Sequence, residues 1–370
     1  MKLIILRGNL KQGLGALERA VVENNNLPIL KNILITADTR VTLQATNLEI
    51  GVTYTTSAKI TEPGSLSIPF TPLYSIIQNS TSERITMESA DNSLTVKTDN
   101  YEAKIQGVAA EEFPIIPKIE SEDRSFEIGG EVFSVAMNQI LGAAATNDLK
   151  PELNSILFDV QADKLICAAT DGFRLAEKKF PHNTVAINGL TTLKALVPLK
   201  TVQEILRVFP GGEQYKISFD DHQILCTTED ITLISRLIDG AYPEYGAIIP
   251  KQTPCELVFD REQLASAIKL VSNFSGKTSD VKLHPTADGK TLEVFASNQL
   301  IGENVYQVPI KKKKGDGIRE IVFNWRYLYE GVRALPDNTI TLALSGETKP
   351  AILKPAEDDS VFYIVMPIQQ

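Results

Sequence analysis

The order of apolar and polar positions recurs three times along the chain. Each copy opens with an amphipathic helix pattern, and a second helix pattern follows several strand patterns later. The leading apolar residues are Leu10, Phe133 and Leu264 for the first pattern, and Leu73, Val202 and Leu328 for the second. Both landmarks give a period of roughly 125 residues, far longer than a solenoid unit. We therefore predict three similar domains with separate cores, against the alternative that β and α patterns recur by chance.

The predicted helices and strands have the same order in each copy. Residues 10–21, 133–145 and 264–274 form the first helices, and residues 67–79, 196–209 and 321–335 form the second ones. Period-two alternation predicts the strands. These are residues 2–8, 32–38, 40–47, 49–60, 84–90, 93–99 and 101–108, then 155–161, 164–171, 174–180, 215–221, 222–229 and 231–239, then 281–287, 291–298, 304–310, 339–345, 350–356 and 362–368.

Strands joined by short turns predict antiparallel sheets, so the fold class is α+β with two helices packed on one face in each copy. Pro-rich joints near residues 113–126 and 242–256 separate the copies. The expected domains are residues 1–122, 123–251 and 252–370. A chain of three similar units can close into a ring with a second copy if its two ends are complementary.

Composition describes an ordinary globular protein without a predicted membrane segment or signal peptide, so we expect a cytoplasmic protein. Its three cysteines lie in or beside strand patterns, so we expect them to be small, buried, apolar side chains. The net charge of −9 argues against a protein that holds nucleic acid by its overall field. Lysines and arginines in the helix patterns leave two alternatives open, namely a local basic face or ordinary solvated helix surfaces.

The residues give little support for catalysis. The chain has three histidines and none of the common nucleotide, nucleophile or metal motifs, so no cofactor and no metal are predicted. Asp171 and the pair Asp220-Asp221 are expected to be turn carboxylates and not catalytic acids. The run Lys311–Lys314 is expected in a loop between a strand and a helix, with phosphate contact as the less favoured alternative.

The last residues, VFYIVMPIQQ, are apolar almost to the end of the chain. They predict either a final core strand or an adaptable apolar surface around Met366, and both can hold because alternate side chains of a strand face opposite sides.

Several segments carry a family resemblance. They are LPILKNILI (27–35), LNSILF (153–158), ATDGFRLA (169–176), AYPEY (241–245) and YIVMPI (363–368). With this spacing over all three copies, the chain resembles the bacterial DNA sliding clamps, the β subunit of DNA polymerase III. The resemblance implies three clamp domains per chain, a head-to-tail homodimeric ring around double-stranded DNA, and no catalysis. It implies as partners the α subunit of DNA polymerase III, the clamp loader and other proteins with clamp-binding motifs.

The resemblance also implies a hydrophobic site for partner peptides between the second and third domains. The matching positions are Leu153, Thr170, Gly172, Phe173, Arg174, Leu175, Pro243, Ala247, Ile248, Tyr327, Ile364, Met366, Pro367 and Ile368. Phe173 stands where the family usually has His, Ala247 stands where Arg is frequent, and the tail ends in Gln369-Gln370. These departures predict a shift toward more apolar or less acidic peptides.

Other family positions match less closely. Asn24 and Lys150 are the expected DNA contacts, and the expected dimer seam joins Ala103 and Ile105 to Leu270 and Val271 of a second copy. Two rival functions stay open at this stage. One is a nucleic-acid enzyme with Asp171 as a metal ligand, and the other is a monomeric peptide-binding scaffold.

Overall fold

The computed structural model describes residues 1–119, 124–147, 149–181, 183–189, 192–315 and 318–369. In these residues all strand pairs are antiparallel. The elements follow the same order three times: one strand, a first helix, five strands, a second helix and three strands. The threefold repeat and the α+β class predicted from the sequence are confirmed.

The three copies have the following elements. The first copy contains β1 (Lys2–Leu6), α1 (Arg7–Leu17), β2 (Asn32–Ala37), β3 (Val41–Thr46), β4 (Ile50–Thr56), β5 (Lys59–Glu62), β6 (Gly64–Pro69), α2 (Phe70–Asn79), β7 (Arg84–Ala90), β8 (Ser93–Lys97) and β9 (Glu102–Gln106). The second contains β10 (Ser125–Gly129), α3 (Gly130–Ile140), β11 (Ser155–Gln161), β12 (Lys164–Thr170), β13 (Arg174–Pro181), β14 (Val185–Asn188), β15 (Thr192–Pro198), α4 (Leu199–Val208), β16 (Gln214–Phe219), β17 (Gln223–Thr227) and β18 (Ile231–Arg236). The third contains β19 (Cys255–Asp260), α5 (Arg261–Val271), β20 (Asp280–Pro285), β21 (Thr291–Asn298), β22 (Gly302–Pro309), β23 (Lys312–Lys314), β24 (Ile321–Asn324), α6 (Trp325–Ala334), β25 (Thr339–Leu344), β26 (Ala351–Pro355) and β27 (Val361–Val365).

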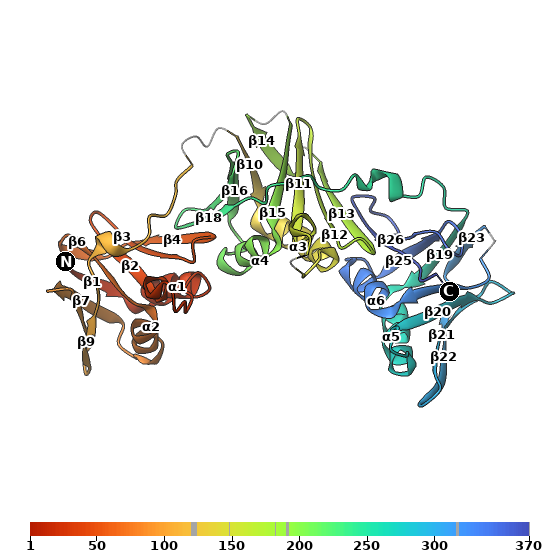
Figure 1. Cartoon of the computed structure of the whole chain (residues 1–370), viewed down its shortest axis with the longest axis horizontal. Coiled ribbons are helices and arrows are strands. Elements are labelled where there is room, and N and C mark those ends of the chain that lie inside the picture. Colours follow the sequence, from red (N-terminus) through yellow and green to blue (C-terminus); the bar gives the residue numbers. More distant parts are fainter. Residues whose placement is uncertain (120–123, 148, 182, 190–191, 316–317, 370) are drawn as a thin grey trace. The chain divides into compact units, whose positions relative to one another are not determined.

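The elements form two compact units. In the first unit, a nine-stranded sheet of order β14-β10-β16-β17-β18-β4-β3-β2-β6 joins the first and second copies, and a five-stranded sheet has the order β5-β1-β7-β8-β9. In the second unit, a nine-stranded sheet of order β15-β11-β12-β13-β27-β26-β25-β19-β23 joins the second and third copies, beside a four-stranded sheet of order β22-β21-β20-β24. The middle copy therefore contributes strands to both units (Figure 1).

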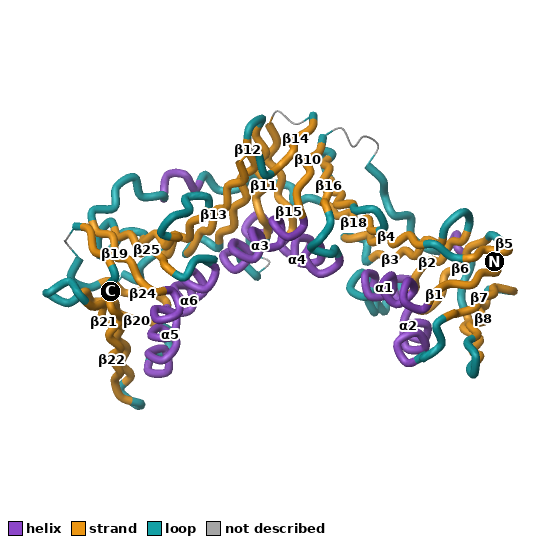
Figure 2. Tube along the Cα trace, turned by 180° about the vertical axis from the view of Figure 1, so that it is seen from behind, coloured by secondary structure: helices purple, strands orange, loops and turns teal. Residues whose placement is uncertain are grey.

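Pairs of helices cover the sheets within each unit. Helices α1 and α2 lie side by side in the first unit, and α5 and α6 do so in the second (Figure 2). Close approach to the sheet needs a small residue on the buried helix face. An ideal Cβ at Gly13 of α1 would lie 2.5 Å from Cδ1 of Tyr54, and one at Gly331 of α6 would lie 2.6 Å from Cδ1 of Tyr363. Because packed interiors have few voids, both positions require glycine.

The sequence patterns placed the helices but not their ends. The first helices begin three residues earlier than predicted, at Arg7, Gly130 and Arg261, because their opening turns hold mostly polar or small residues without an apolar signal. The patterns for the second helices were wrong at their start. Residues 67–69 and 196–198 end strands β6 and β15, and residues 321–324 form the whole of β24, since a short apolar run has no period that separates strand from helix.

Several strands were missing from the prediction. Strands β10, β14, β19 and β23 had no predicted counterpart, and the predicted strand at residues 49–60 is divided between β4 and β5. The expected lysine loop was also wrong: Lys312–Lys314 form the edge strand β23, paired with β19, and Lys314 Nζ lies 3.6 Å from Glu256. Lysines on an edge strand hinder pairing with other chains, which gives this run a structural role.

The three cysteines are buried, as predicted. Burial raises the pKa of the Cys167 and Cys226 thiols, which keeps both in the unreactive protonated form.

Two substitutions in α1 test the packing of this helix. We expect Gly13→Ala to lower the free energy of unfolding by about 1–3 kcal/mol, because the new methyl group meets the Tyr54 ring. We expect Gly15→Ala to be neutral or to stabilise by about 0.5–1 kcal/mol, because nothing lies within 4 Å of an added Cβ and alanine favours a helix. Thermal unfolding followed by circular dichroism compares the two, and equal midpoints would contradict this packing.

Candidate functional site

The turn between β12 and β13 is built by two side chains and a glycine of its own sequence. Asp171 accepts hydrogen bonds from the backbone N–H groups of Phe173 at 2.9 Å and Arg174 at 3.0 Å. Thr170 accepts one from the Gly172 N–H at 3.1 Å and donates one to the Arg174 carbonyl. Gly172 has φ of +89°, a conformation that glycine adopts without strain. The turn therefore holds Phe173 and Arg174 in fixed positions, and Asp171 is a turn carboxylate as predicted.

The guanidinium of Arg174 joins the second copy to the third. Its Nε donates to Asp171 at 2.9 Å, and its Nη1 donates to Glu330 of α6 and to the Tyr363 hydroxyl at 3.3 Å. The Arg174 side chain is only 11% exposed. Burial alone would lower the pKa of Arg174, but Tyr363, Glu330 and Asp171 together raise it, so the group stays charged.

Two aromatic rings form an apolar shelf over this ion pair. The Phe173 and Tyr327 rings stack with centroids 6.3 Å apart and an interplanar angle of 22°. The Arg174 guanidinium carbon lies 4.4 Å from the Tyr327 ring centroid. Phe173 is 62% exposed, which is unusual for a large apolar side chain held by a rigid turn. An exposed aromatic side chain that loses little freedom on binding is a good contact for a ligand.

The chain end is fastened beside this shelf. The Met366 N–H donates to the Phe173 carbonyl at 2.9 Å, and the Ile368 N–H donates to the Val322 carbonyl at 2.8 Å. Pro367 is buried and pairs with Phe323, whereas Met366 is half-buried. Both alternatives for this segment hold, since Val361–Val365 form the core strand β27 and Met366 follows it at the surface.

Leu175 and Ile364 lie opposite each other in the paired strands β13 and β27, and both are fully buried. They belong to a cluster with Leu157, Ala168 and Leu196. The segment after β18 covers this cluster with further side chains, Ile238, Tyr242, Tyr245 and Ile249.

Two tyrosine hydroxyls fix the covering segment. The hydroxyl of Tyr242 donates to the Ala168 carbonyl at 3.4 Å, and that of Tyr245 donates to Glu177 at 2.7 Å. Burial, and then the bond to Glu177, raises the pKa of Tyr245, so its hydroxyl remains a donor. A pocket of about 610 Å³ lies beneath the segment and includes Pro243 in its lining.

The structure thus brings together part of the predicted peptide site. Interactions join the following positions: Thr170, Gly172, Phe173, Arg174, Leu175, Tyr327, Ile364 and Met366. Pro367 and Ile368 attach instead to Phe323 and Val322. Leu153 ends a short 3₁₀ turn and is buried, while Pro243, Ala247 and Ile248 are exposed on the covering segment. Gln369 is exposed, and Gln370 lies outside the described residues.

Sequence reasoning missed Glu330 and Tyr363, two partners of Arg174. The sequence pattern predicts only an exposed helix position for Glu330 and only a core strand position for Tyr363. No local spacing signals their contact with a residue that precedes them by more than 150 positions.

The expected DNA and seam positions occupy varied environments. Asn24 is exposed and accepts hydrogen bonds from the backbone N–H groups of Asn26 and Leu27, and Lys150 is also exposed. Leu270 is 51% exposed, whereas Val271 is buried inside its own unit. Ala103 is half-buried, and Ile105 is buried.

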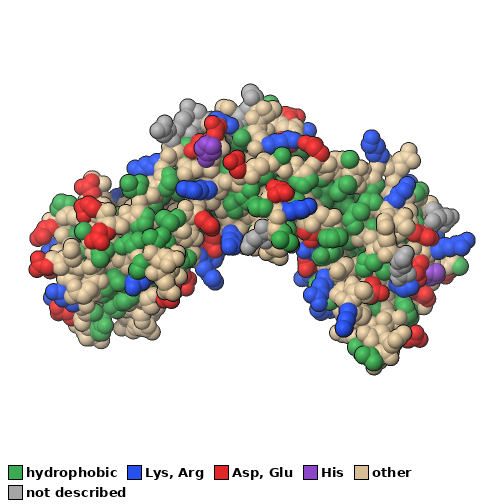
Figure 3. All heavy atoms as spheres, viewed as in Figure 1, with side chains coloured by type: hydrophobic (Ala, Val, Ile, Leu, Met, Phe, Trp, Pro, Cys, Tyr) green, Lys and Arg blue, Asp and Glu red, His purple; other side chains and the backbone are tan. Residues whose placement is uncertain are grey.

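Charges of both signs are interspersed on the face shown in Figure 3. Two basic helix residues form ion pairs with neighbouring acids: Arg207 contacts Glu204, and Arg333 contacts Glu262. Within the described part of the chain, no group of three His, Cys, Asp or Glu residues could hold a metal ion. No helix of that part has the length and apolar character needed to cross a bilayer.

Comparison with known proteins identifies the family. Three family models match in succession, the N-terminal domain of the DNA polymerase III beta subunit at residues 1–117, its central domain at 127–244 and its C-terminal domain at 246–369. The chain belongs to the DNA polymerase III β subunit family. The three matches show that the chain has three clamp domains. The domain boundaries predicted after residues 122 and 251 stay predictions. The first boundary falls within residues 120–123, which lie outside the described residues.

Individual relatives agree along the full length. A beta sliding clamp of Synechococcus elongatus is 28% identical, with 100% of this chain and 99% of the relative covered. One of Staphylococcus aureus is 25% identical over 95% of this chain and 94% of its own length. Solved sliding clamps of Pseudomonas aeruginosa and Bacillus subtilis superpose with TM-scores of 0.94 each, at 25% and 22% identity, over 100% of this chain and 100% and 99% of theirs. The protein is accordingly a sliding clamp, a non-catalytic processivity factor of DNA polymerase III.

The Arg174 ion pairs differ in burial from those on the helix surfaces, and a matched pair of substitutions tests this difference. We expect Arg174→Gln to lower the free energy of unfolding by about 2–3 kcal/mol, because it leaves the poorly exposed Asp171 carboxylate without its cation. Arg333→Gln breaks an exposed pair with Glu262 and should cost at most about 1 kcal/mol. Urea unfolding measures the stability of both variants. Equal shifts of the midpoint would show that the Arg174 ion pairs stabilise the fold no more than an exposed pair does.

Proposed function

We propose that this sliding clamp works in the cytoplasm as a head-to-tail homodimeric ring that encircles double-stranded DNA. It would tether the α subunit of DNA polymerase III, the clamp loader and other proteins through short motifs that bind at Phe173, Arg174, Tyr327 and Met366. The observation that supports the ring is a junction that occurs twice within the chain, while the corresponding strands of the first and third copies, β9 and β22, each lie at the edge of a described sheet.

The first junction joins the first two copies. Strand β18 pairs with β4, with Leu233 opposite Val52. Arg40 binds Asp230, which lies in the turn before β18, at 2.6 Å. Near the ends of the helices, Nη1 of Arg207 in α4 donates to the carbonyl oxygen of Gly15 in α1 at 3.3 Å.

The second junction repeats this arrangement between the second and third copies. Strand β27 pairs with β13, and Lys178 lies 3.7 Å from Asp358 in the turn before β27. An added Cβ at Gly142, just after α3, would lie 3.7 Å from Glu330 of α6. In both junctions, the last strand of one copy therefore pairs with the fourth strand of the preceding copy, and its second helix meets the end of the preceding first helix.

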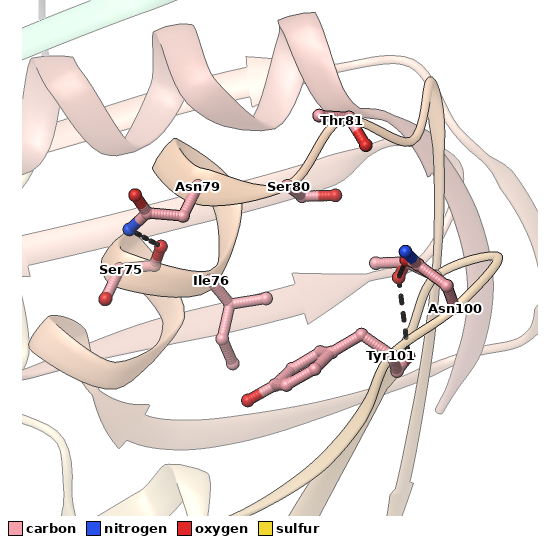
Figure 4. Close-up of a pocket in the computed structure, with 8 residues that line it drawn as sticks. Ser75, Ile76, Asn79, Ser80, Thr81, Asn100 and Tyr101 are labelled. Carbon is pink, nitrogen blue, oxygen red and sulfur yellow. Dashed lines mark hydrogen bonds between the residues drawn. The ribbon is translucent and has the colours of Figure 1, made fainter.

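The elements that would form a third junction belong to the first and third copies. Strand β9, the last of the first copy, and strand β22, the fourth of the third copy, are each an edge of their described sheets. Beside β9, a pocket of about 360 Å³ lies between the end of α2 and the turn before β9, and the Tyr101 ring extends toward Ile76 in it (Figure 4). Near β22, the end of α5 carries the exposed Leu270. Two copies would pair β9 with β22 and direct Leu270 toward the pocket.

This arrangement supports the seam positions on β9 and at Leu270. Ala103 and Ile105 lie opposite Val96 and Leu94 of β8, so they share a face with the buried residues of that strand. Ile105 and Val271 would support the seam mainly from within their own domains, since both side chains are buried.

Retention on DNA tests the ring. We expect the loaded protein to stay on nicked circular DNA at ~0.5 M salt, because a closed ring is held by topology and not by phosphate contacts. At the same salt concentration it should leave DNA that has been linearised, because the ring can slide off a free end. Release is followed by gel filtration of labelled protein. Equal losses from circular and linear DNA at each salt concentration would contradict a closed ring.

A single apolar side chain tests the seam. We expect Leu270→Asp to weaken the dimer about tenfold or more, because it puts a charge in place of an exposed leucine that each seam of the proposed ring would bury. Ile115→Asp is the control, since Ile115 is exposed in the joint between the first two domains and outside the proposed seam. Sedimentation equilibrium measures the dimer constant. A dimer unaffected by Leu270→Asp, or weakened equally by the control, would place the seam elsewhere.

A further inference from the structure

The three interacting charged groups beside Phe173, those of Arg174, Asp171 and Glu330, contain one positive and two negative charges. Arg174 binds two carboxylates, those of Asp171 and Glu330, so one base faces two acids. Two other bases of α6 interact with other residues. Arg333 binds Glu262 at 3.0 Å, and the Arg326 guanidinium lies 5.3 Å from the Trp325 ring centroid.

The two acids differ in their access to solvent. The Asp171 side chain is 13% exposed and bound to two backbone N–H groups, so it is a fixed part of the turn. The Glu330 side chain is 48% exposed, and α6 holds its backbone. Glu330 can therefore interact with a charged group of a ligand on the shelf, whereas Asp171 acts mainly by compensating Arg174.

The position of Arg174 hinders its use as an anion receptor. Its Nε and Nη1 donate to Asp171, Glu330 and Tyr363, and Tyr327 covers the plane of its guanidinium. An incoming carboxylate would have to compete with Glu330 and would experience the net negative charge of the cluster. An incoming ammonium or guanidinium group would meet a half-exposed carboxylate beside an aromatic surface, which favours a cation.

We infer that the shelf selects linear peptides in which Lys or Arg flanks the apolar anchor residues, and that it discriminates against Asp or Glu at the same place. The inference rests on the proposed peptide site and specifies the charge of the partner's motif. Glu330 would be the residue that sets this specificity, and Phe173, Tyr327 and Met366 would provide the apolar contacts common to all motifs.

Three labelled decapeptides test the inference. They share Leu, Leu and Phe anchors and differ only in two flanking residues, which are Lys-Lys, Gln-Gln or Glu-Glu. Fluorescence anisotropy with the full-length protein at low salt should give the order Lys above Gln above Glu, with about threefold to fivefold between successive peptides, the range for exposed charge pairs. The differences should shrink in ~0.5 M salt, where the Debye length is short.

A matched pair of variants assigns the effect to Glu330. Glu330→Gln keeps a hydrogen-bond acceptor for Arg174 but removes the charge, so it should bind the Lys-Lys and Glu-Glu peptides with affinities within about twofold of each other. Glu357→Gln makes the same change of net charge at an exposed turn residue of the third domain, and it should keep the wild-type order of affinities. Sedimentation of each variant shows whether the dimer is intact.

The outcomes separate the inference from the proposed function. If the Gln-Gln peptide binds the wild type but the three peptides have equal affinities, the charge preference is wrong and the peptide site stands. The same holds if Glu330→Gln and Glu357→Gln have identical effects. If no peptide binds the intact dimer, both the site and the inference are wrong.

Discussion

Antiparallel strand pairing between consecutive copies is the constraint on which the rest of this structure depends. Strands β18 and β4, and strands β27 and β13, make two nine-stranded sheets out of pieces that lie in different repeats. Each pairing satisfies backbone groups that would otherwise form exposed sheet edges. Because side chains alternate along a strand, the register also decides which residues of the two copies share a face.

The shelf of Phe173 and Tyr327 is a consequence of one of these registers. Arg174 lies opposite Val365, and Leu175 lies opposite Ile364, so the turn before β13 and the segment after β27 leave the sheet at the same point. A slip of one residue would turn Leu175 and Ile364 out of their buried cluster and separate the Met366 N–H from the Phe173 carbonyl. Tyr363, two residues before the end of β27, reaches Arg174 for the same reason.

How far the sequence predicts this arrangement follows from the range over which each interaction acts. Helical and strand periods are local, so the three copies and most central strands were predictable, whereas the edge strand β23, with lysine at each position, has no apolar alternation. The turn from Thr170 to Arg174 is also local, and its Asp and Gly signal it directly. The Arg174 contacts with Glu330 and Tyr363 depend on register between copies, and residue types alone do not encode that register.

The acidic composition would suit the proposed ring, which closure and not charge would hold on DNA. A protein that neutralises many phosphates binds tightly but depends strongly on salt, and each contact opposes movement along the duplex. Here two helix cations are compensated by carboxylates, Arg207 by Glu204 and Arg333 by Glu262, and the Lys269 ammonium lies 5.0 Å from the Trp325 ring centroid. In a closed ring, such compensated cations would give weak and interchangeable contacts with the backbone. Affinity would then reside in the peptide shelf and in the seam, and the DNA would pass through without a preferred position.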